Sequence, residues 1–324
     1  MTIVFLLIIG EQKCGKLKTD KMLRRKQLKN ILVLGATGML GSMVFSYLGK
    51  NKALNVAGTC RNNEDLSFFN QKSNLYLFNA NRDLPSQLDN IIKEFPVDYI
   101  INCIGVIKPH CRDTDPEGVF NAIKVNSLFP HILNKSIKQL GDNIKIIQIA
   151  TDCVFSGKKG EYNEDDKHDA LDVYGKTKSL GEVQSKNFMN IRCSIIGPEI
   201  SSKTSLLEWF LSNSKNSEIN GFTHHQWNGI TTLQFGQFCE EIITQNQFYE
   251  LRKINHVIHY VPNNSVSKYE LLCLIQDVYD TKYIIKEVDN LGSPTDRTLK
   301  SKYLNFSVKK NIKDELLKLR LFNN

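Results

Sequence analysis

A short apolar run followed directly by a glycine-rich turn begins the regular part of this chain. Residues 31–34 are four consecutive aliphatic side chains, as expected for a strand that is covered on both faces. Glycines then recur at every third position, which lets the backbone approach a ligand closely and lets a helix pack tightly on the strand. The amides and the dipole of such a helix N-terminus favour phosphate groups. The sequence therefore predicts a site for a dinucleotide pyrophosphate, with these candidate residues: Gly35, Thr37, Gly38, Met39, Leu40 and Gly41.

Strand-like and helix-like segments alternate from residue 30 to residue 198. Short β-rich runs predict strands, and segments with a period of 3.6 residues between them predict helices. This order is typical of an α/β fold, a doubly wound parallel (Rossmann) sheet, which binds its ligand at the carboxyl ends of the strands. Strands are predicted over 31–34, 55–60, 75–78, 99–104, 144–150 and 189–196, and helices over 84–94 and 121–140.

After Gly197 and Pro198 the pattern becomes looser, which predicts a second and smaller unit. Residues 199–324 mix helical and strand-like segments and are expected to form mainly a mixed α/β substrate-binding lobe. A strand near 256–261 is expected to rejoin the main sheet. The predicted parts are therefore a basic N-terminal extension (1–29), a dinucleotide-binding Rossmann domain (30–198) and the lobe (199–324).

The net charge of +8 is concentrated at the N-terminus. Residues 1–30 hold eight lysines and arginines against two acidic residues, so the rest of the chain is nearly neutral. Composition therefore predicts no nucleic-acid partner. The apolar residues 2–9 are too few to span a bilayer and lack the flanks of a secretory signal, so no membrane insertion is expected. Met22 is an alternative start, which leaves open whether residues 1–21 are translated.

Eight cysteines are spread along the chain without a Cys-x-x-Cys pair or histidines at a zinc-binding spacing. Several of them lie within strand-like apolar runs. This distribution is typical of reduced and mostly buried thiols, and it predicts a cytoplasmic protein.

The end of the second predicted strand bears on the choice of cofactor. Folds that bind NAD place an acidic residue there for the ribose hydroxyls, whereas this chain reads Thr59-Cys60-Arg61. A guanidinium at this point can pair with a 2′-phosphate. Arg61 therefore favours NADPH, with NADH as the alternative if Arg61 is an ordinary surface arginine.

Tyr174 and Lys178 form the candidate catalytic pair. Residues four apart lie on one face of a helix, so the ammonium can approach both the phenol and the ribose of a bound cofactor. A nearby positive charge lowers the pKa of a phenol from its usual value of about 10, which suits acid–base work. A Tyr-x-x-x-Lys spacing alone arises often by chance. Here Thr151 directly follows the fifth predicted strand, and its hydroxyl can bind a carbonyl oxygen, so the three residues predict carbonyl reduction.

Longer motifs make the chain resemble a known family. Residues 150–157, 160–165 and 173–178 read ATDCVFSG, GEYNED and VYGKTK, and further matches lie at 191–197, 268–272 and 296–299. Together they resemble dTDP-4-dehydrorhamnose reductase and its relatives among the extended short-chain dehydrogenases, from about residue 30 to about residue 305. The resemblance implies that Thr151, Tyr174 and Lys178 are the catalytic residues. It also implies further cofactor-binding residues: Asn79, Ala80, Ile104 and Gly105.

The same resemblance implies a reaction and a substrate class. The 4-keto group of a nucleotide-activated 4-keto-6-deoxy sugar would be reduced, in deoxysugar or polysaccharide biosynthesis. The nicotinamide would supply a hydride to C4, while Tyr174 donates a proton and Lys178 holds the ribose. Asp152 and Cys153 are expected to contact the substrate. The family usually has tyrosine at the position of Cys153, so the identity of the sugar stays open.

Two alternative functions stay open. One is a sugar-nucleotide epimerase or a bifunctional epimerase and reductase, for which Cys111 is the candidate acid–base group if it is not an ordinary loop cysteine. The other is a non-catalytic subunit similar to the regulatory β-subunit of methionine adenosyltransferase, which resembles this family and acts by binding a partner. A homodimer is common in the family, without a signature for it in this sequence. The acidic residues that bind magnesium in some members have no clear counterpart here, so no metal is predicted.

Overall fold

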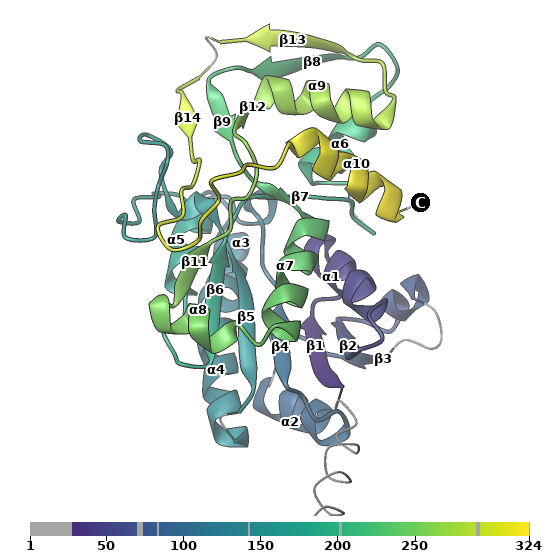
Figure 1. Cartoon of the computed structure of the whole chain (residues 1–324), viewed down its shortest axis with the longest axis vertical. Helices are drawn as coiled ribbons and strands as arrows, with labels where there is room; N and C mark the ends of the chain where they lie inside the picture. The colour runs from purple at the N-terminus through teal and green to yellow at the C-terminus, as the bar shows by residue number, and fades with distance from the viewer. Residues whose placement is uncertain are drawn as a thin grey trace, which may run out of the picture.

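A seven-stranded parallel sheet forms the centre of the protein. The computed structural model describes residues 28–69, 74–82, 84–141, 143–200, 203–289 and 292–323. The strands of the sheet are β1 (Lys29–Leu34), β2 (Leu54–Cys60), β3 (Asn74–Leu77), β4 (Tyr99–Asn102), β5 (Lys145–Ala150), β6 (Phe188–Arg192) and β11 (Val257–His259). They lie in the order β11-β6-β5-β4-β1-β2-β3, and each neighbouring pair is parallel (Figure 1). The predicted doubly wound Rossmann architecture is confirmed.

Helices cover both faces of this sheet because successive strand residues point in opposite directions. Ile31 and Val33 belong to the core cluster on one face, and Leu32 and Leu34 belong to the cluster on the other. The helices of the first cluster are α1 (Met39–Gly49), α7 (Thr232–Thr244) and α8 (Phe248–Ile254), and those of the second are α2 (Leu84–Glu94) and α4 (Phe129–Leu140). The continuous apolar run at 31–34 is thus explained by burial on both sides.

The position of β1 determines where a ligand can bind. β1 lies between β2 and β4, so the chain builds the sheet in one direction through β2 and β3 and in the other through β4, β5 and β6. Such a reversal leaves a crevice outside the carboxyl ends of the two central strands. Leu34 and Asn102, which end β1 and β4, are partners in register. The turns that follow them therefore open on the same crevice.

A smaller lobe lies above the carboxyl ends of the sheet in Figure 1. Its core is formed largely by α9 and α10, through residues such as Leu271, Ile275 and Leu316. Its short strands pair in three small sheets, β10-β7, β12-β9-β14 and β13-β8. The elements are β7 (Ile195–Ile196), α6 (Leu206–Leu211), β8 (Glu218–Phe222), β9 (His225–Trp227), β10 (Ile230–Thr231), β12 (Val266–Ser267), α9 (Lys268–Tyr279), β13 (Ile284–Val288), β14 (Thr295–Asp296) and α10 (Ile312–Asn323).

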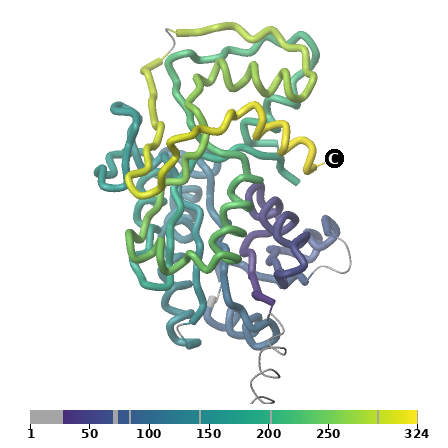
Figure 2. The backbone as a smooth tube through the Cα atoms, viewed as in Figure 1, coloured from purple at the N-terminus to yellow at the C-terminus, as the bar shows by residue number. Residues whose placement is uncertain are grey.

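The segment between β14 and α10 connects this lobe with the main sheet. Figure 2 shows it running down from the lobe and then returning to the C-terminal helix. On its way it forms isolated β-bridges, Leu299 with Tyr162 and Lys310 with Asn263. Residues 297–303 consequently lie beside the loop that follows β5.

The limits of two predicted elements were wrong. The helix predicted over 121–140 begins earlier, because Pro116 occupies the first turn of α3 (Pro116–Ala122), where proline is favoured. A π-helical segment (Ile123–Leu128) then joins α3 to α4. The strand predicted over 189–196 ends at Arg192, and β7 instead pairs with β10. An apolar run alone does not reveal that the chain leaves one sheet for another.

The described cysteines agree with the expected thiol chemistry. All seven are free, and those that are buried are Cys60, Cys111, Cys193 and Cys239. Cys14 and residues 1–27 of the basic extension lie outside the described residues. Of the helices in the described part of the chain, none combines the length and the apolar character that crossing a membrane requires.

Candidate active site

A cleft opens at the carboxyl ends of β1, β2, β3 and β4. The turns after these strands form its walls. The predicted cofactor-binding residues that line it are Gly35, Thr37, Gly38, Met39, Arg61, Asn79, Ala80, Ile104 and Gly105. Lining residues that the sequence patterns did not assign to it include Asp65, Phe78, Asn121, Val125, Glu199 and Ile200. These lie in segments without a local signature, so their place in the cleft becomes visible only in the fold.

The turn after β1 depends on two glycines. Gly35 has φ of +79°, in the left-handed region that favours glycine. A Cβ on Gly41 would lie 2.0 Å from the carbonyl oxygen of Gly35, so α1 can approach the turn only because Gly41 has no side chain. The Gly35 N–H donates to Thr59 Oγ1 at 3.0 Å, which ties the turn to β2. Leu40 and Gly41, predicted as cofactor-binding residues, lie behind the turn and are not among the residues that line the cleft.

The first turn of α1 suits a pyrophosphate. Its N-cap is Gly38, which has no side chain to accept hydrogen bonds from the first-turn amides. Those amides and the helix dipole are thus available for an anionic ligand. Arg61 and Asn62 line the far end of the cleft, after β2. The chemistry of the lining residues therefore fits a dinucleotide that lies along the ends of the strands.

The helix α5 (Val173–Leu180) carries the candidate catalytic pair. Its N-cap Asp172 accepts a hydrogen bond from the Gly175 N–H at 2.7 Å, which defines where the helix begins. A Cβ on Gly175 would lie 2.4 Å from the carbonyl oxygen of Cys153. Glycine at this position therefore lets the helix pack closely on the loop after β5. That contact brings Tyr174 next to the end of β5.

The phenol of Tyr174 keeps its proton. Burial raises the pKa of Tyr174 well above its usual value, and the neighbouring Cys153 and Asp152 act in the same direction. A hydrogen bond with the Thr151 side chain opposes them. Lys178, expected to lower this pKa, is not among the groups that act on it here, and its ammonium donates to the main-chain carbonyl of Ile149. A protonated phenol is the form that can donate a proton to a carbonyl oxygen.

The ammonium of Lys178 is buried close to Gly105, and neither Lys178 nor Tyr174, both predicted as cofactor-binding residues, is among the residues that line the cleft. It donates to the carbonyl oxygen of Ile149, at the end of β5, at 2.9 Å. A Cβ on Gly105, which lines the cleft, would lie 3.9 Å from it. Burial lowers the pKa of Lys178 to about 8, while the carboxylate of Glu182 opposes this. At neutral pH the ammonium is therefore largely charged.

Thr151 and Asp152 are both buried at the end of β5. The Thr151 hydroxyl accepts from the Cys153 N–H at 3.1 Å and donates to Asp152 Oδ1 at 3.1 Å. It also lies within hydrogen-bonding reach of Tyr174. A carbonyl oxygen bound at this point would replace Asp152 as the acceptor of the threonine hydroxyl. Two donors would then point to the same oxygen.

Three cations surround this point, and the sequence patterns had indicated no role for them. Burial raises the pKa of Cys153 to about 12, and the positive charges of Lys108 and Arg297 oppose this. Lys268, the first residue of α9, faces Arg297 and Cys153. The three come from the loop after β4, from the lobe and from the segment before α10, so no local pattern could join them. Lys108 forms an ion pair with Asp172 at 2.8 Å, so the positive charge that favours an anionic substrate here comes from Lys268 and Arg297.

Cys111 does not have the properties of an acid–base group. Its side chain is buried in an apolar cluster with Val106, Ala122 and Val125. The thiol donates to the carbonyl oxygen of Ile107 at 3.3 Å. Burial raises the pKa of Cys111, with nearby carboxylates acting in the same direction. A thiol that keeps its proton is a weak base at neutral pH, so these contacts favour a packing role for this loop cysteine.

No metal site is found within the ranges that the structure describes: three or more His, Cys, Asp or Glu side chains do not gather there in a suitable group. The absence of a metal from the whole protein stays a prediction.

A comparison with known protein families identifies the family to which this chain belongs. The model of the RmlD substrate binding domain matches residues 29–311, which is most of the chain. The protein belongs to this family. The match spans the sheet that forms the cleft, the lobe that carries Lys268 and the segment that carries Arg297.

Relatives of this family member include a subunit of another enzyme. Methionine adenosyltransferase 2 subunit beta of zebrafish (Danio rerio) is 27% identical over 262 residues, 78% of this chain and 74% of the relative. The protein of the same name from cattle (Bos taurus) is 25% identical over 262 residues, 78% of this chain and 72% of the relative.

Solved structures share the fold. A dTDP-4-dehydrorhamnose reductase from Clostridium acetobutylicum has a TM-score of 0.67 and 19% identity, over 91% of this chain and 100% of that one. The dTDP-4-dehydrorhamnose reductase from Bacillus anthracis, solved in complex with NADP, has a TM-score of 0.68 and 16% identity, over 91% and 99%. The fold of this family member is therefore that of the extended short-chain dehydrogenases.

Proposed function

We propose that this protein uses NADPH to reduce the 4-keto group of a nucleotide-activated sugar. The observation that carries the proposal is that the protonated phenol of Tyr174 lies within hydrogen-bonding reach of the Thr151 hydroxyl at the carboxyl end of β5. The ammonium of Lys178, on the same helix as Tyr174, lies close to the cleft residue Gly105. The family match supports a substrate of this class.

Tyr174, Thr151 and Lys178 each have a different role in the proposed reaction. When bound, the nicotinamide supplies the hydride that the carbonyl carbon receives. Tyr174 donates its proton to the carbonyl oxygen as negative charge develops there. Thr151 donates a hydrogen bond to the same oxygen and so stabilises that charge. Lys178 binds the ribose hydroxyls, which orients the cofactor against the carbonyl.

Lys268 and Arg297 are placed to bind the diphosphate of such a substrate. A diphosphate carries negative charge that Lys268 and Arg297 can pair with, and arginine can do so through two parallel hydrogen bonds. The dTDP-sugar reductases of similar fold support a nucleotide-linked sugar. Cys153, in place of the tyrosine usual in the family, is proposed to shape the pocket around the sugar.

Purified protein tested with NADPH and a panel of dTDP- and UDP-linked 4-keto sugars provides the direct test. Loss of the NADPH absorbance is expected with at least one of them, with formation of the 4-hydroxy product. Binding of NADPH without oxidation by any member of the panel would contradict the reductase function.

Replacing Arg61 with glutamine is expected to weaken NADPH binding by roughly tenfold and to leave NADH binding nearly unchanged, because one charge-assisted hydrogen bond to the 2′-phosphate is lost. Fluorescence titration with both cofactors measures this. Lys52→Gln is the matched control, since Lys52 is an exposed cation that is not among the cleft residues. Equal losses of affinity for NADPH and NADH would show that Arg61 does not bind the 2′-phosphate.

A regulatory role is the second candidate function. The identity to methionine adenosyltransferase 2 subunit beta favours it. In that case the protein would bind a methionine adenosyltransferase catalytic subunit and alter its kinetics, and Tyr174→Phe would leave this effect intact. Turnover of a sugar nucleotide that depends on Tyr174 distinguishes the reductase from the subunit. The homodimer and the cytoplasmic location stay predictions under either function.

A further inference from the structure

The loop that joins β4 to α3, residues 103–115, lies between the cofactor cleft and Tyr174. Its first residues, 103–106, line the cleft. Val106 and Cys111 of the same loop belong to an apolar cluster against which the Tyr174 side chain packs. One loop therefore contacts both the space for the cofactor and the residue that is proposed to donate the proton.

Lys108, in the middle of this loop, is joined to the first turn of α5. Its ammonium forms an ion pair with Asp172 Oδ2 at 2.8 Å. The other oxygen of the Asp172 carboxylate accepts from the Gly175 N–H at 2.7 Å. The ammonium also lies 5.9 Å from the centre of the Tyr174 ring, which is within the range of a cation–π contact. A single carboxylate therefore fastens the loop to the helical turn that carries Tyr174.

A second contact fastens the same two segments. The Val173 N–H donates to Asp113 Oδ1 at 3.0 Å. An N–H group in the first turn of a helix has no partner within the helix, so Asp113 satisfies a donor that would otherwise need water. The loop thus supplies a cation for the cap residue of α5 and an acceptor for the residue that follows it. Tyr174 is the next residue along the chain.

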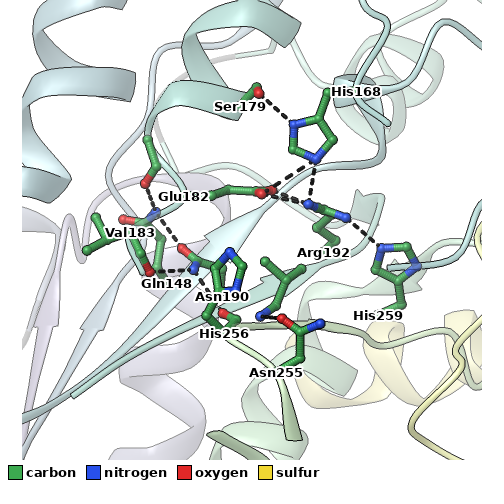
Figure 3. A network of polar contacts seen from close by, with 12 residues as sticks. Gln148, His168, Ser179, Glu182, Val183, Asn190, Arg192, Asn255, His256 and His259 are labelled. Carbon is green, nitrogen blue, oxygen red and sulfur yellow. Dashed lines mark hydrogen bonds and ion pairs between the residues drawn. The ribbon is translucent and has the colours of Figure 1, made fainter. Parts of the chain in front are cut away.

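The C-terminal end of α5 is held by different contacts. Nδ1 of His168 lies 2.5 Å from Ser179 Oγ (Figure 3). The Gln148 side chain, on β5, donates to the Gly181 carbonyl oxygen at 2.8 Å. Neither contact involves the loop after β4. The position of the last turn of the helix is therefore independent of Lys108, whereas the first turn depends on it.

The part of the loop that lines the cleft is also held without Lys108. Asn126 Oδ1 accepts from the Val106 N–H at 2.8 Å, and the Asn126 amide group donates to the Val106 carbonyl oxygen at 2.9 Å. The Cys103 N–H donates to the Leu34 carbonyl oxygen at 3.1 Å, which continues the pairing of β4 with β1. Loss of the Lys108 ammonium would therefore leave the wall of the cleft in place.

We propose that Lys108 and Asp172 are positioning residues, which hold the phenol of Tyr174 at a fixed place relative to the cofactor cleft. Their ion pair joins the loop that lines the cleft to the turn that carries the proton donor. Reduction of a carbonyl needs the hydride and the proton to reach adjacent atoms, and a misplacement of about 1 Å can slow such a reaction roughly 100-fold. This role rests on the proposed function, because it assumes that Tyr174 protonates a substrate carbonyl.

Lys108→Met tests the role, since it keeps most of the apolar stem of the side chain and removes its charge. The kcat for a sugar nucleotide that the wild-type protein reduces is expected to fall roughly tenfold. The KM for the sugar nucleotide and the Kd for NADPH should change by less than about twofold, because the cleft is held by other contacts. Lys108→Arg, which retains the charge, should recover most of the kcat. Steady-state kinetics and fluorescence titration measure these quantities.

Asp172→Asn tests the other half of the pair. Asparagine caps a helix about as well as aspartate does, so the hydrogen bond from Gly175 can persist while the charge that holds Lys108 is lost. The kcat should fall as much as in Lys108→Met. The double variant should be no slower than either single variant, because both substitutions remove the same interaction.

Lys286→Met is the matched control. Lys286, on β13, forms a half-exposed ion pair with Glu218, on β8, at 2.5 Å, in the lobe. The same change there removes a pair of similar exposure without touching the loop after β4, so kcat should be retained. Exposed ion pairs contribute little to stability, and Lys108→Met and Lys286→Met should therefore both melt close to the temperature of the wild type.

The outcomes separate this role from the proposed function. A wild-type protein that reduces no sugar nucleotide would contradict the function and the role together. Wild-type turnover with a kcat that Lys108→Met changes by less than about twofold would overturn the positioning role alone. A raised KM in Lys108→Met with a normal kcat in Asp172→Asn would also overturn it, because Lys108 would then bind the substrate directly. So would an equal loss of kcat in Lys286→Met.

Discussion

Tyr174→Phe is expected to lower kcat about 10³-fold for any sugar nucleotide that the wild-type protein reduces, since it removes the proton donor. The substitution leaves the ring in its apolar surroundings beside Cys111 and Val125. Lys178 and the glycine turn are untouched, so the Kd for NADPH should change by less than about twofold. Steady-state kinetics and fluorescence titration measure the two quantities separately.

Tyr47→Phe is the control for this prediction. It removes another partly buried tyrosine hydroxyl, one that donates to Glu240 at 2.5 Å away from the cleft. Turnover should be retained in this variant. If Tyr174→Phe kept activity within a factor of about ten, the loss would be too small for a general acid and another donor would have to be sought.

Gly41→Ala is expected to destabilise the protein by about 3 kcal/mol, at the upper end of what overpacking a well-packed site costs. The added Cβ would lie 2.0 Å from the oxygen and 2.7 Å from the carbon of the Gly35 carbonyl. Both are main-chain atoms that cannot rotate away, so α1 must move from β1. Displacing the turn by about 1 Å should weaken NADPH binding roughly 100-fold.

Gly49→Ala provides the comparison within the same helix. A Cβ on Gly49 meets nothing within 4 Å, and alanine is the better helix former by about 0.5–1 kcal/mol. This variant should therefore be as stable as the wild type or slightly more so. Urea unfolding with and without NADPH measures both effects. Equal unfolding midpoints for the two variants would contradict the close approach of α1 to its turn.

The local sequence predicted well those elements whose structure depends on a few neighbouring residues. The run 31–34 must be buried on both faces, and the glycines after it are needed wherever a helix and a ligand both approach the backbone. Gly35 and Gly38 accordingly line the cleft, as their spacing indicated. The strand expected over 189–196 was predicted wrongly because its end is not decided by local sequence. Ile195 belongs to β7, which leaves β6 to pair with β10, a separate strand of the lobe.

The electrostatics of the candidate site could not be predicted from spacing. The interval between Tyr174 and Lys178 places them on one helix face, but it does not reveal where the ammonium points. In the fold it donates to Ile149, and burial rather than Lys178 governs the phenol. Glu182 follows α5 and Arg192 ends β6, ten residues later, and they form a pair only because the chain between them folds back.

By itself, the sequence determined the order of strands and helices, the glycine turn and the three residue types that carbonyl reduction requires. These follow from backbone sterics and from periodicities that act over a few residues. The tertiary structure alone decided which groups are charged and what they face. It brought Lys108, Lys268 and Arg297 around Cys153, and it buried Glu182 and Arg192 as an ion pair. The reason is physical: a pKa depends on burial and on charges from distant segments, and only packing determines both.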